Sequence, residues 1–440
     1  MLILKFSIHL WMLVIVAAVG VSVGCGKTEP PPFRLNMTNV VAKQIAPDHQ
    51  QAIANILGAM FGSPDQPVAL PETGLQQKWL TMAAGPVWSD KEGGKHGLYR
   101  RHCVHCHGIS GDGQGPTAAV LNPYPRDYRP GVFKFKSTYT AAEPTDRDLH
   151  KTLHDGVPGT SMPSFALLPE DEISALVEYV KYLSIRGQME TALENHVADE
   201  LNPGDKFDPA ADPAVQKLIV TDLLGPIMES WNGAKDQVIN PEDAAIPPDN
   251  RPAKEIEASV VAGRALFFGS KANCVKCHGP TAIGDGQQDD YDNWSKATNE
   301  FIKATNDKIG QIQTLQADLS KAEGDTGQLK DQLLAAQKEF NERHALVASL
   351  LPPRNAIPRN LREGTFRGGR RPVDVFWRIS AGIAGTPMPA SGPAAEGAQG
   401  TLTQQEIWQI VDYVHSLPFE PASQPQKKAI VNTGAISTGE

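Results

Sequence analysis

The pentapeptide Cys-x-x-Cys-His occurs twice in the chain, at 103–107 and at 274–278. Two thiols three positions apart lie on one helical turn, and the histidine follows the second thiol directly. This is the attachment pattern of haem c, in which both thiols bond to one porphyrin and the histidine becomes the proximal ligand of the iron. The sequence therefore predicts two covalently bound haem c groups, one held by Cys103, Cys106 and His107 and one by Cys274, Cys277 and His278.

Other interpretations of paired cysteines fit the neighbouring residues less well. A zinc site would need further Cys or His at matching spacing, and the two halves share none. A thioredoxin-like thiol pair would not be followed by His-Gly in both copies. A disulfide framework would not leave four of five cysteines in two close pairs within 440 residues.

The surroundings of the two pentapeptides repeat as well. The recurring patterns are a helix with Gly and an aromatic residue (97–99 and 263–267), Gly-Asp-Gly-Gln (111–114 and 284–287), Pro-Arg-x-x-Arg-x-Gly-x-Phe (125–133 and 358–366), Gly-Thr-x-Met-Pro (159–163 and 385–389) and a closing helix (170–183 and 404–417). The chain is therefore predicted to contain two tandem copies of one helical unit.

The second unit contains an insert that the first unit lacks. From His107 to Arg126 is 19 residues, whereas from His278 to Arg359 is 81. The additional segment, 289–350, is rich in charged residues and Gln and has apolar residues at helical spacing on both sides of a Gly-containing turn at 323–327. We expect an antiparallel helical hairpin with coiled-coil-like packing, which either docks a protein subunit or is a passive insertion.

With these motifs, both halves resemble class I c-type cytochrome domains, over residues 93–184 and over 255–290 with 351–418. The resemblance implies a mainly α fold and an association with a bacterial respiratory chain. It also implies that Met162 and Met388 are the distal iron ligands. A thioether favours ferrous iron and raises the reduction potential, and the proline after each methionine stiffens its loop. The alternative is a methionine that fills a gap in the core.

Four arginines recur between the proximal and distal motifs: Arg126, Arg129, Arg359 and Arg362. A buried haem brings two propionate carboxylates that need donors or positive charge, so these arginines are predicted to bind them. The alternative is a set of salt bridges on the surface. His150 and His154 compete as iron ligands in the first unit. The second unit has Phe376 and Ser380 at the equivalent positions, which favours surface or propionate-side histidines.

The N-terminal segment carries an export signal pattern. Lys5 precedes an apolar run that ends before Cys25 and is short for a membrane-spanning helix. The Gly-Cys junction resembles a bacterial lipoprotein cleavage site, although Ser22 departs from it. Lipidation at Cys25, an uncleaved anchor and ordinary cleavage all remain open. All three place the rest of the chain outside the cytoplasm, on the periplasmic side, with membrane association through the N-terminus.

These patterns divide the chain into an export segment (1–25), an extended lead-in with one short helix (26–92), a cytochrome c domain (93–190), a linker with one helix (191–254), a second cytochrome c domain (255–418, with the insert 289–350) and a disordered tail (419–440). The net charge of −9 argues against nucleic acid as a partner.

The predicted function is single-electron transfer between respiratory-chain partners, with a respiratory redox protein or an oxidase complex as the neighbour. This reading makes the chain an electron carrier rather than an enzyme. One alternative is a dihaem peroxidase-type enzyme, which would need one accessible iron, and the two equivalent Met motifs argue against it. Another is a structural haem-bearing subunit of a larger respiratory complex.

Overall fold

The computed structural model describes residues 32–392 and 402–423, and it is mainly helical, as predicted. Its strands, within these ranges, are β1 (Trp88–Ser89) and β2 (Lys95–His96), which pair antiparallel. The predicted site at Cys25 lies outside the described residues, as does the tail beyond 423. No helix in the described ranges is both long enough and apolar enough to cross a membrane.

Unit 1 is built around one long helix. Its helices are α5 (Leu98–His102), α6 (Val104–His107), α7 (Asp146–Asp155) and α8 (Glu170–Glu200). The closing helix was predicted to end at 183, but α8 continues for another 17 residues because the chain meets no helix breaker before Asn202-Pro203. Its buried face continues along this extension through Met189, Leu193 and Val197, so the extension needs a packing partner.

The segment before unit 1 supplies that partner. It contains the one short helix predicted for 26–92, but also two further helices, so the rest of it is not simply extended. It forms α2 (Met37–Ala42), α3 (Pro47–Phe61) and α4 (Gln77–Ala83), and α3 and α4 pack against α8. Ile53, Leu57 and Phe61 recur at a spacing of four and are buried on one face of α3.

The segment 191–254 also packs more closely than a linker. The expected helix is present as α9 (Pro213–Lys217), a π-helical stretch (Leu218–Leu224) and α10 (Gly225–Gly233). Trp231 is buried, contacts Phe133 edge-on and donates a hydrogen bond from Nε1 to Gln188 at 2.8 Å. This stretch therefore belongs to the core of unit 1.

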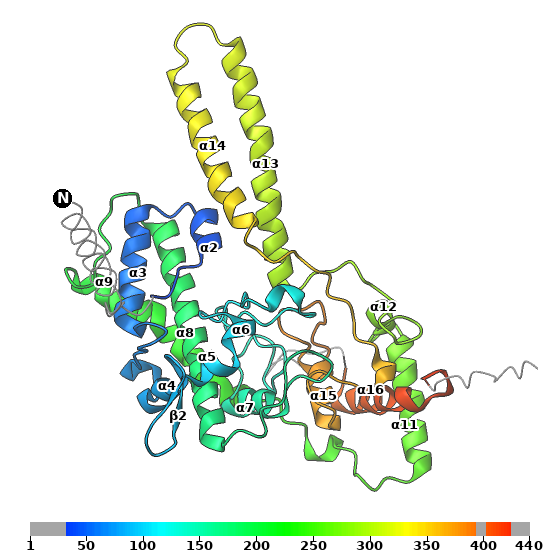
Figure 1. Ribbon diagram of the computed structural model, residues 1–440. Coiled ribbons are helices and arrows are strands. Elements are labelled where there is room, and N and C mark those ends of the chain that lie inside the picture. The colour runs from blue at the N-terminus through cyan, green and yellow to red at the C-terminus, as the bar shows by residue number, and fades with distance from the viewer. Residues whose placement is uncertain (1–31, 393–401, 424–440) are drawn as a thin grey trace, which may run out of the picture.

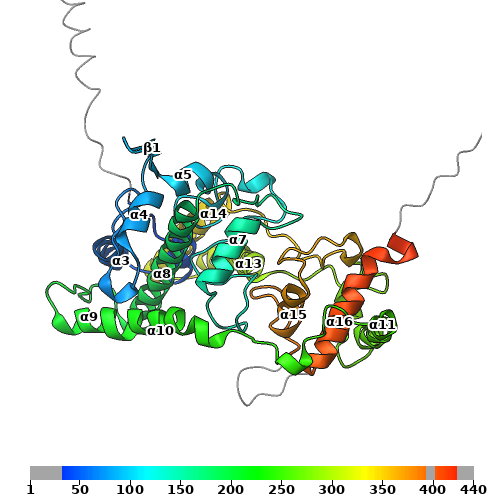
Figure 2. The same ribbon diagram turned by 90° about the horizontal axis from the view of Figure 1, so that it is seen from below.

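Unit 2 repeats the arrangement with α11 (Ala253–Phe268), α12 (Val275–His278), α15 (Pro372–Ser380) and α16 (Gln404–Ser416). Helix α11 packs along α16, and Phe267 contacts Tyr413 edge-on between them. Figure 2 shows the two units side by side, with α7 of unit 1 facing α15 of unit 2.

The insert is the predicted antiparallel hairpin, and it projects from the body of the molecule (Figure 1). It consists of α13 (Asn293–Lys321) and α14 (Gly327–Val347). Asp292 caps α13 by accepting a hydrogen bond from the Ser295 amide at 2.9 Å. The base of α14 contacts α2, so the hairpin is anchored against the helical segment that precedes unit 1.

Candidate haem-binding site

One continuous cavity of about 1720 Å³ lies between the two units. Both Cys-x-x-Cys-His motifs line it, and so do Met162 and Met388. The structure thus brings together all eight residues predicted to attach or ligate the two haems. Sequence alone did not indicate that the two sites share a single space.

The proximal histidine of unit 1 is held in the form that binds iron. His107 lies at the end of α6, is buried, and its Nδ1 is 3.0 Å from the carbonyl oxygen of Arg126. Because a carbonyl only accepts, Nδ1 donates this hydrogen bond and Nε2 is left free for a metal. Burial lowers the pKa of His107 from its ordinary 6.5 to about 4, so the ring is neutral at physiological pH.

The equivalent histidine of unit 2 has a looser environment. Burial also lowers the pKa of His278, and the nearby carbonyl of Arg359, the repeat counterpart of Arg126, partly opposes this effect. His107 stacks on Tyr128 at 4.6 Å between ring centroids, whereas His278 has Phe267 at 6.1 Å. The two proximal sites therefore follow one plan, with tighter packing in unit 1.

The four motif cysteines are free thiols in this structure, as attachment to a porphyrin requires. Burial raises the pKa of Cys103 from 9.0 to about 12 and that of Cys274 to about 11. A thiol that stays protonated at neutral pH is a poor redox nucleophile. The environment of Cys103 and Cys274 therefore fits structural thioether links.

The two methionine loops have the same hydrogen bonds. In unit 1 the Met162 amide donates to Thr160 Oγ1 at 3.1 Å, and this hydroxyl donates to the Val157 carbonyl at 2.8 Å. In unit 2 the Met388 amide donates to Thr386 Oγ1 at 3.3 Å. The Thr386 hydroxyl donates in turn to the Ile383 carbonyl at 2.8 Å. The threonine of each Gly-Thr-x-Met-Pro motif thus fixes the backbone of the methionine.

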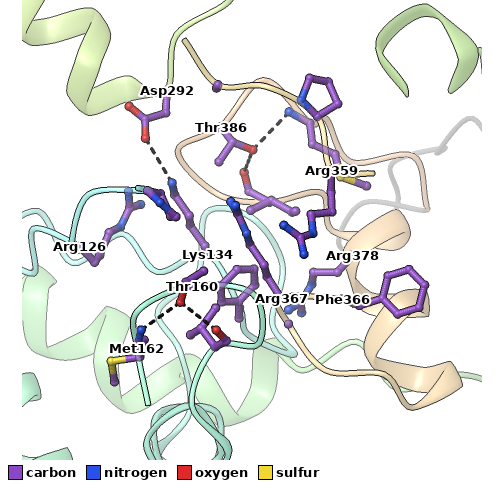
Figure 3. A pocket seen from close by; sticks show the side chains of 18 of the residues that line it. Arg126, Lys134, Thr160, Met162, Asp292, Arg359, Phe366, Arg367, Arg378 and Thr386 are labelled. Carbon is purple, nitrogen blue, oxygen red and sulfur yellow. Dashed lines mark hydrogen bonds and ion pairs between the residues drawn. The ribbon is translucent and has the colours of Figure 1, made fainter. Parts of the chain in front are cut away.

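Positive side chains gather in the middle of the cavity, where Figure 3 shows them turned toward one another. We call this group the central cation cluster: Arg126, Lys134, Arg359, Arg367 and Arg378, with Asp292 as its carboxylate. Lys134 Nζ lies 3.2 Å from Asp292 Oδ2. The cluster therefore carries five positive charges against one negative charge.

The cations of the cluster lack sufficient counter-charge. Burial lowers the pKa of Arg126, Lys134 and Arg367, and lowers that of Arg378 to about 10. The Nε atoms of Arg367 and Arg378 are buried without a hydrogen-bond partner in the described chain. Buried donors of this kind need anionic acceptors. Two haems bring four propionate carboxylates, so the residues present fit haem.

Only half of the predicted propionate arginines reach the cavity. Arg126 and Arg359 line it, but Arg129 and Arg362 do not. Arg129 forms a bidentate pair with Asp127, and Arg362 bonds to Glu420, Ser423 and the Thr281 carbonyl. The side chains of these two arginines leave the loop away from the cavity and pair with Asp127 and Glu420 instead.

Three cations of the cluster were missed from sequence. Lys134 and Arg367 each follow the final Phe of the Pro-Arg-x-x-Arg-x-Gly-x-Phe repeat, so one more repeated position would have found them. Arg378 has Thr152 as its repeat counterpart, and no pattern pointed to it. His150 and His154 line a separate cavity of about 530 Å³ and contact Glu170 and Asp155, at 2.5 and 2.8 Å.

Comparison with known proteins supports the cofactor class. The family described as Cytochrome c matches residues 94–184, so the chain contains a cytochrome c domain in unit 1. No curated protein matches the chain. One similar solved structure is from the Kuenenia stuttgartiensis reducing HAO-like protein complex. It is 21% identical, covers 75% of this chain and 97% of that chain, and has a TM-score of 0.41, a level at which two chains need not share a fold.

Proposed function

We propose that the protein is a dihaem c-type cytochrome that passes single electrons between respiratory-chain partners outside the cytoplasm. The observation that carries the proposal is the shared cavity, which two complete sets of attachment and ligand residues line on both sides of one cation cluster. A bound haem would supply a one-electron Fe(III)/Fe(II) couple. The chain attaches it, presents a neutral histidine and a held methionine, and offers buried cations to its carboxylates.

The equivalence of the two methionine loops favours electron transfer over peroxidase-type catalysis. A peroxidase-type enzyme needs one iron with an accessible position, hence two unlike distal sites. Here both distal loops have the same threonine and methionine hydrogen bonds. With Met162 and Met388 as distal ligands, neither unit would leave a position for substrate, and a bound haem would supply only a one-electron couple.

The environment and partners of the protein form the second part of the proposal. The N-terminal pattern supports export to the periplasmic side, with anchoring by lipid at Cys25 or by the apolar segment. The hairpin is proposed to dock a protein subunit with a helical face, in a redox protein or oxidase complex. In its outer half Ile309 and Leu334 are 42% and 64% exposed among charged residues, a mixture that suits protein better than nucleic acid.

The proposal is tested on the full chain expressed with haem-attachment machinery. Intact mass should exceed the mature chain by two haems, and changing both Cys103 and Cys106 to Ala should remove one. Redox titration should show two one-electron steps, and added cyanide should react slowly with both irons. A chain with one haem or none, or rapid cyanide binding at one iron, would contradict the proposed function.

A further inference from the structure

We infer that Arg126 and Arg359 brace the two methionine loops crosswise, each arginine holding the loop of the other unit. This inference rests on the proposed function, because the loops are taken to carry the distal ligands. Without it, the two units would be independent electron carriers on one chain. With it, each distal ligand is positioned only when both units are docked.

The first brace runs from unit 1 to unit 2. Arg126 Nε donates to the Val132 carbonyl at 2.7 Å, which fixes the guanidinium within its own loop. Its Nη2 then reaches the Ala384 carbonyl of unit 2 at 3.5 Å, a long hydrogen bond. A Cβ atom placed on Gly385 would lie only 2.8 Å from Nη2. The guanidinium therefore lies against the Ala384-Gly385 turn that precedes Thr386 and Met388.

The second brace runs from unit 2 to unit 1 and has the same plan as the first, but without a hydrogen bond to the opposite turn in the described residues. Arg359 Nε donates to the Thr365 carbonyl at 3.2 Å, and Thr365 is the repeat counterpart of Val132. A Cβ atom on Gly159 would lie 2.5 Å from Arg359 Nη2. The same arginine, anchored in the same way, thus meets the same glycine of the opposite motif. The contact therefore occurs in both directions, as expected for two repeats that face each other about a pseudo-two-fold axis.

The glycines explain why the contact is possible. Gly159 and Gly385 have φ angles of +71° and +73°, a region that residues with a side chain rarely adopt. Any side chain there would also displace the guanidinium of the opposite unit. In each Gly-Thr-x-Met-Pro motif the glycine therefore leaves room for the arginine of the other unit, and the threonine holds the methionine of its own unit.

The two braces differ in what surrounds them. Arg359 Nη2, the atom that faces Gly159, also donates a hydrogen bond to the exposed Glu363 at 3.2 Å. This donor is therefore divided between two contacts. On the other side the Gly385 carbonyl accepts from the Asn293 amide at 3.0 Å, so the hairpin start supports the same turn that Arg126 contacts. We therefore expect the Arg126 brace on the Met388 loop to be the stronger one.

The test must show which methionine responds to which arginine. In a Met162→Ala background only the second haem retains sulfur-to-iron charge-transfer absorption, and in a Met388→Ala background only the first does. Arg126→Gln and Arg359→Gln are placed in each background, and the loss of the band is followed with rising temperature. Arg362→Gln is the matched control, since it removes the same charge from the Arg359 loop without touching either methionine loop.

Crosswise bracing predicts that Arg126→Gln increases the dissociated population of Met388 by about tenfold, consistent with loss of a charged hydrogen bond. It should leave Met162 unchanged, and Arg359→Gln should show the reverse pattern with a smaller effect. The inference is wrong if each arginine variant destabilises the methionine of its own unit, or if Arg362→Gln increases methionine dissociation to the same extent. If the single-Met variants show no such band at all, it is the proposed ligation that fails instead.

Discussion

Replacing Asp292 by Asn isolates the charge balance of the central cation cluster. The Asp292 side chain has two roles: Oδ2 pairs with Lys134 at 3.2 Å, and Oδ1 caps α13 through the Ser295 amide at 2.9 Å. Asn is about as good an N-cap as Asp, so the helix start is retained while the charge is lost. The cluster then has one negative charge fewer, which favours the reduced state of both haems. Both reduction potentials should rise.

The size of the rise follows from Coulomb's law. At an effective dielectric constant near 20, one charge acts on another about 10–15 Å away with roughly 1.1–1.7 kcal/mol. For a one-electron couple this corresponds to about 50–70 mV, since 59 mV is tenfold in the equilibrium constant. The rise should shrink in high salt only slightly, because Asp292 and Lys134 are both mostly shielded from solvent.

A matched set of variants checks the sign in an optical redox titration. Lys134→Gln should lower both potentials by a similar amount, and the double variant should return close to the wild-type values. If Asp292→Asn lowers the potentials, or if the double variant adds rather than cancels, the cluster does not act on the haems through charge. Absorbance at the haem bands in the oxidised form serves as the control for intact ligation.

The same carboxylate has a defined pH dependence. Burial raises the pKa of Asp292, but Lys134 and the Ser295 amide outweigh burial, so the pKa lies below its ordinary 3.8. A carboxyl group whose pKa folding lowers contributes stability above the unfolded-state pKa, and this is lost as the pH falls through the folded-state pKa. Asp292 is therefore ionised throughout the neutral range. The difference in reduction potential between Asp292→Asn and wild type should be constant between about pH 5 and 8. Asp292→Asn should also lose less stability than wild type below pH 3.8.

Three further predictions address the ligands, the anchor and the hairpin. Met162→Ala or Met388→Ala should each remove about half of the sulfur-to-iron absorption and lower one potential. An intact band in Met162→Ala that disappears in His154→Ala would show the ligand assignment of unit 1 to be wrong. Cys25→Ser should move the protein from the membrane to the soluble exported fraction, and a variant that stays membrane-bound with residues 1–24 present indicates an uncleaved anchor. Replacing residues 309–335 by a short Gly/Ser loop should preserve both haem spectra and weaken copurification with the redox partner. Unchanged copurification would mean that the hairpin is a passive insertion.

Sequence predicted those parts of the site that depend on local spacing. The Cys-x-x-Cys-His motifs and Gly-Thr-x-Met-Pro loops are short, and their internal geometry follows from neighbouring residues. The hairpin was predictable because helical periodicity is also local, and its helices span 29 and 21 residues. The direction in which each side chain points could not be predicted from local spacing. Arg126 and Arg129 are three residues apart in one motif, yet one enters the cavity and the other pairs with Asp127.

The packing around unit 1 also depends on long-range contacts that local sequence patterns do not reveal. Helix α3 has an amphipathic pattern, but nothing in it indicates that α8 is its partner. The tie between them is the Tyr182 hydroxyl, which donates to the Phe61 carbonyl across 121 positions of sequence. The shared cavity is a similar long-range property, because it exists only where the loops of the two repeats meet.

The insert begins and ends where the loops of the two units contact each other. In unit 1 a short loop joins the proximal histidine to Arg126. In unit 2 the insert replaces this loop, and both the start and the end of the insert pack against the short loop of unit 1. Trp294 contacts Tyr124 edge-on at 5.6 Å, and Arg354 donates to the Leu121 carbonyl at 2.5 Å while its guanidinium lies 3.8 Å from the Tyr124 ring. The two ends of the insert thus clamp unit 1 to unit 2. Beyond Thr305 on α13 and before Ala336 on α14, neither helix has a buried residue. The root of the hairpin therefore serves the pairing of the two units. In the outer half, Ile312, Leu319 and Leu333 are only partly buried, and this half is the part available to a partner.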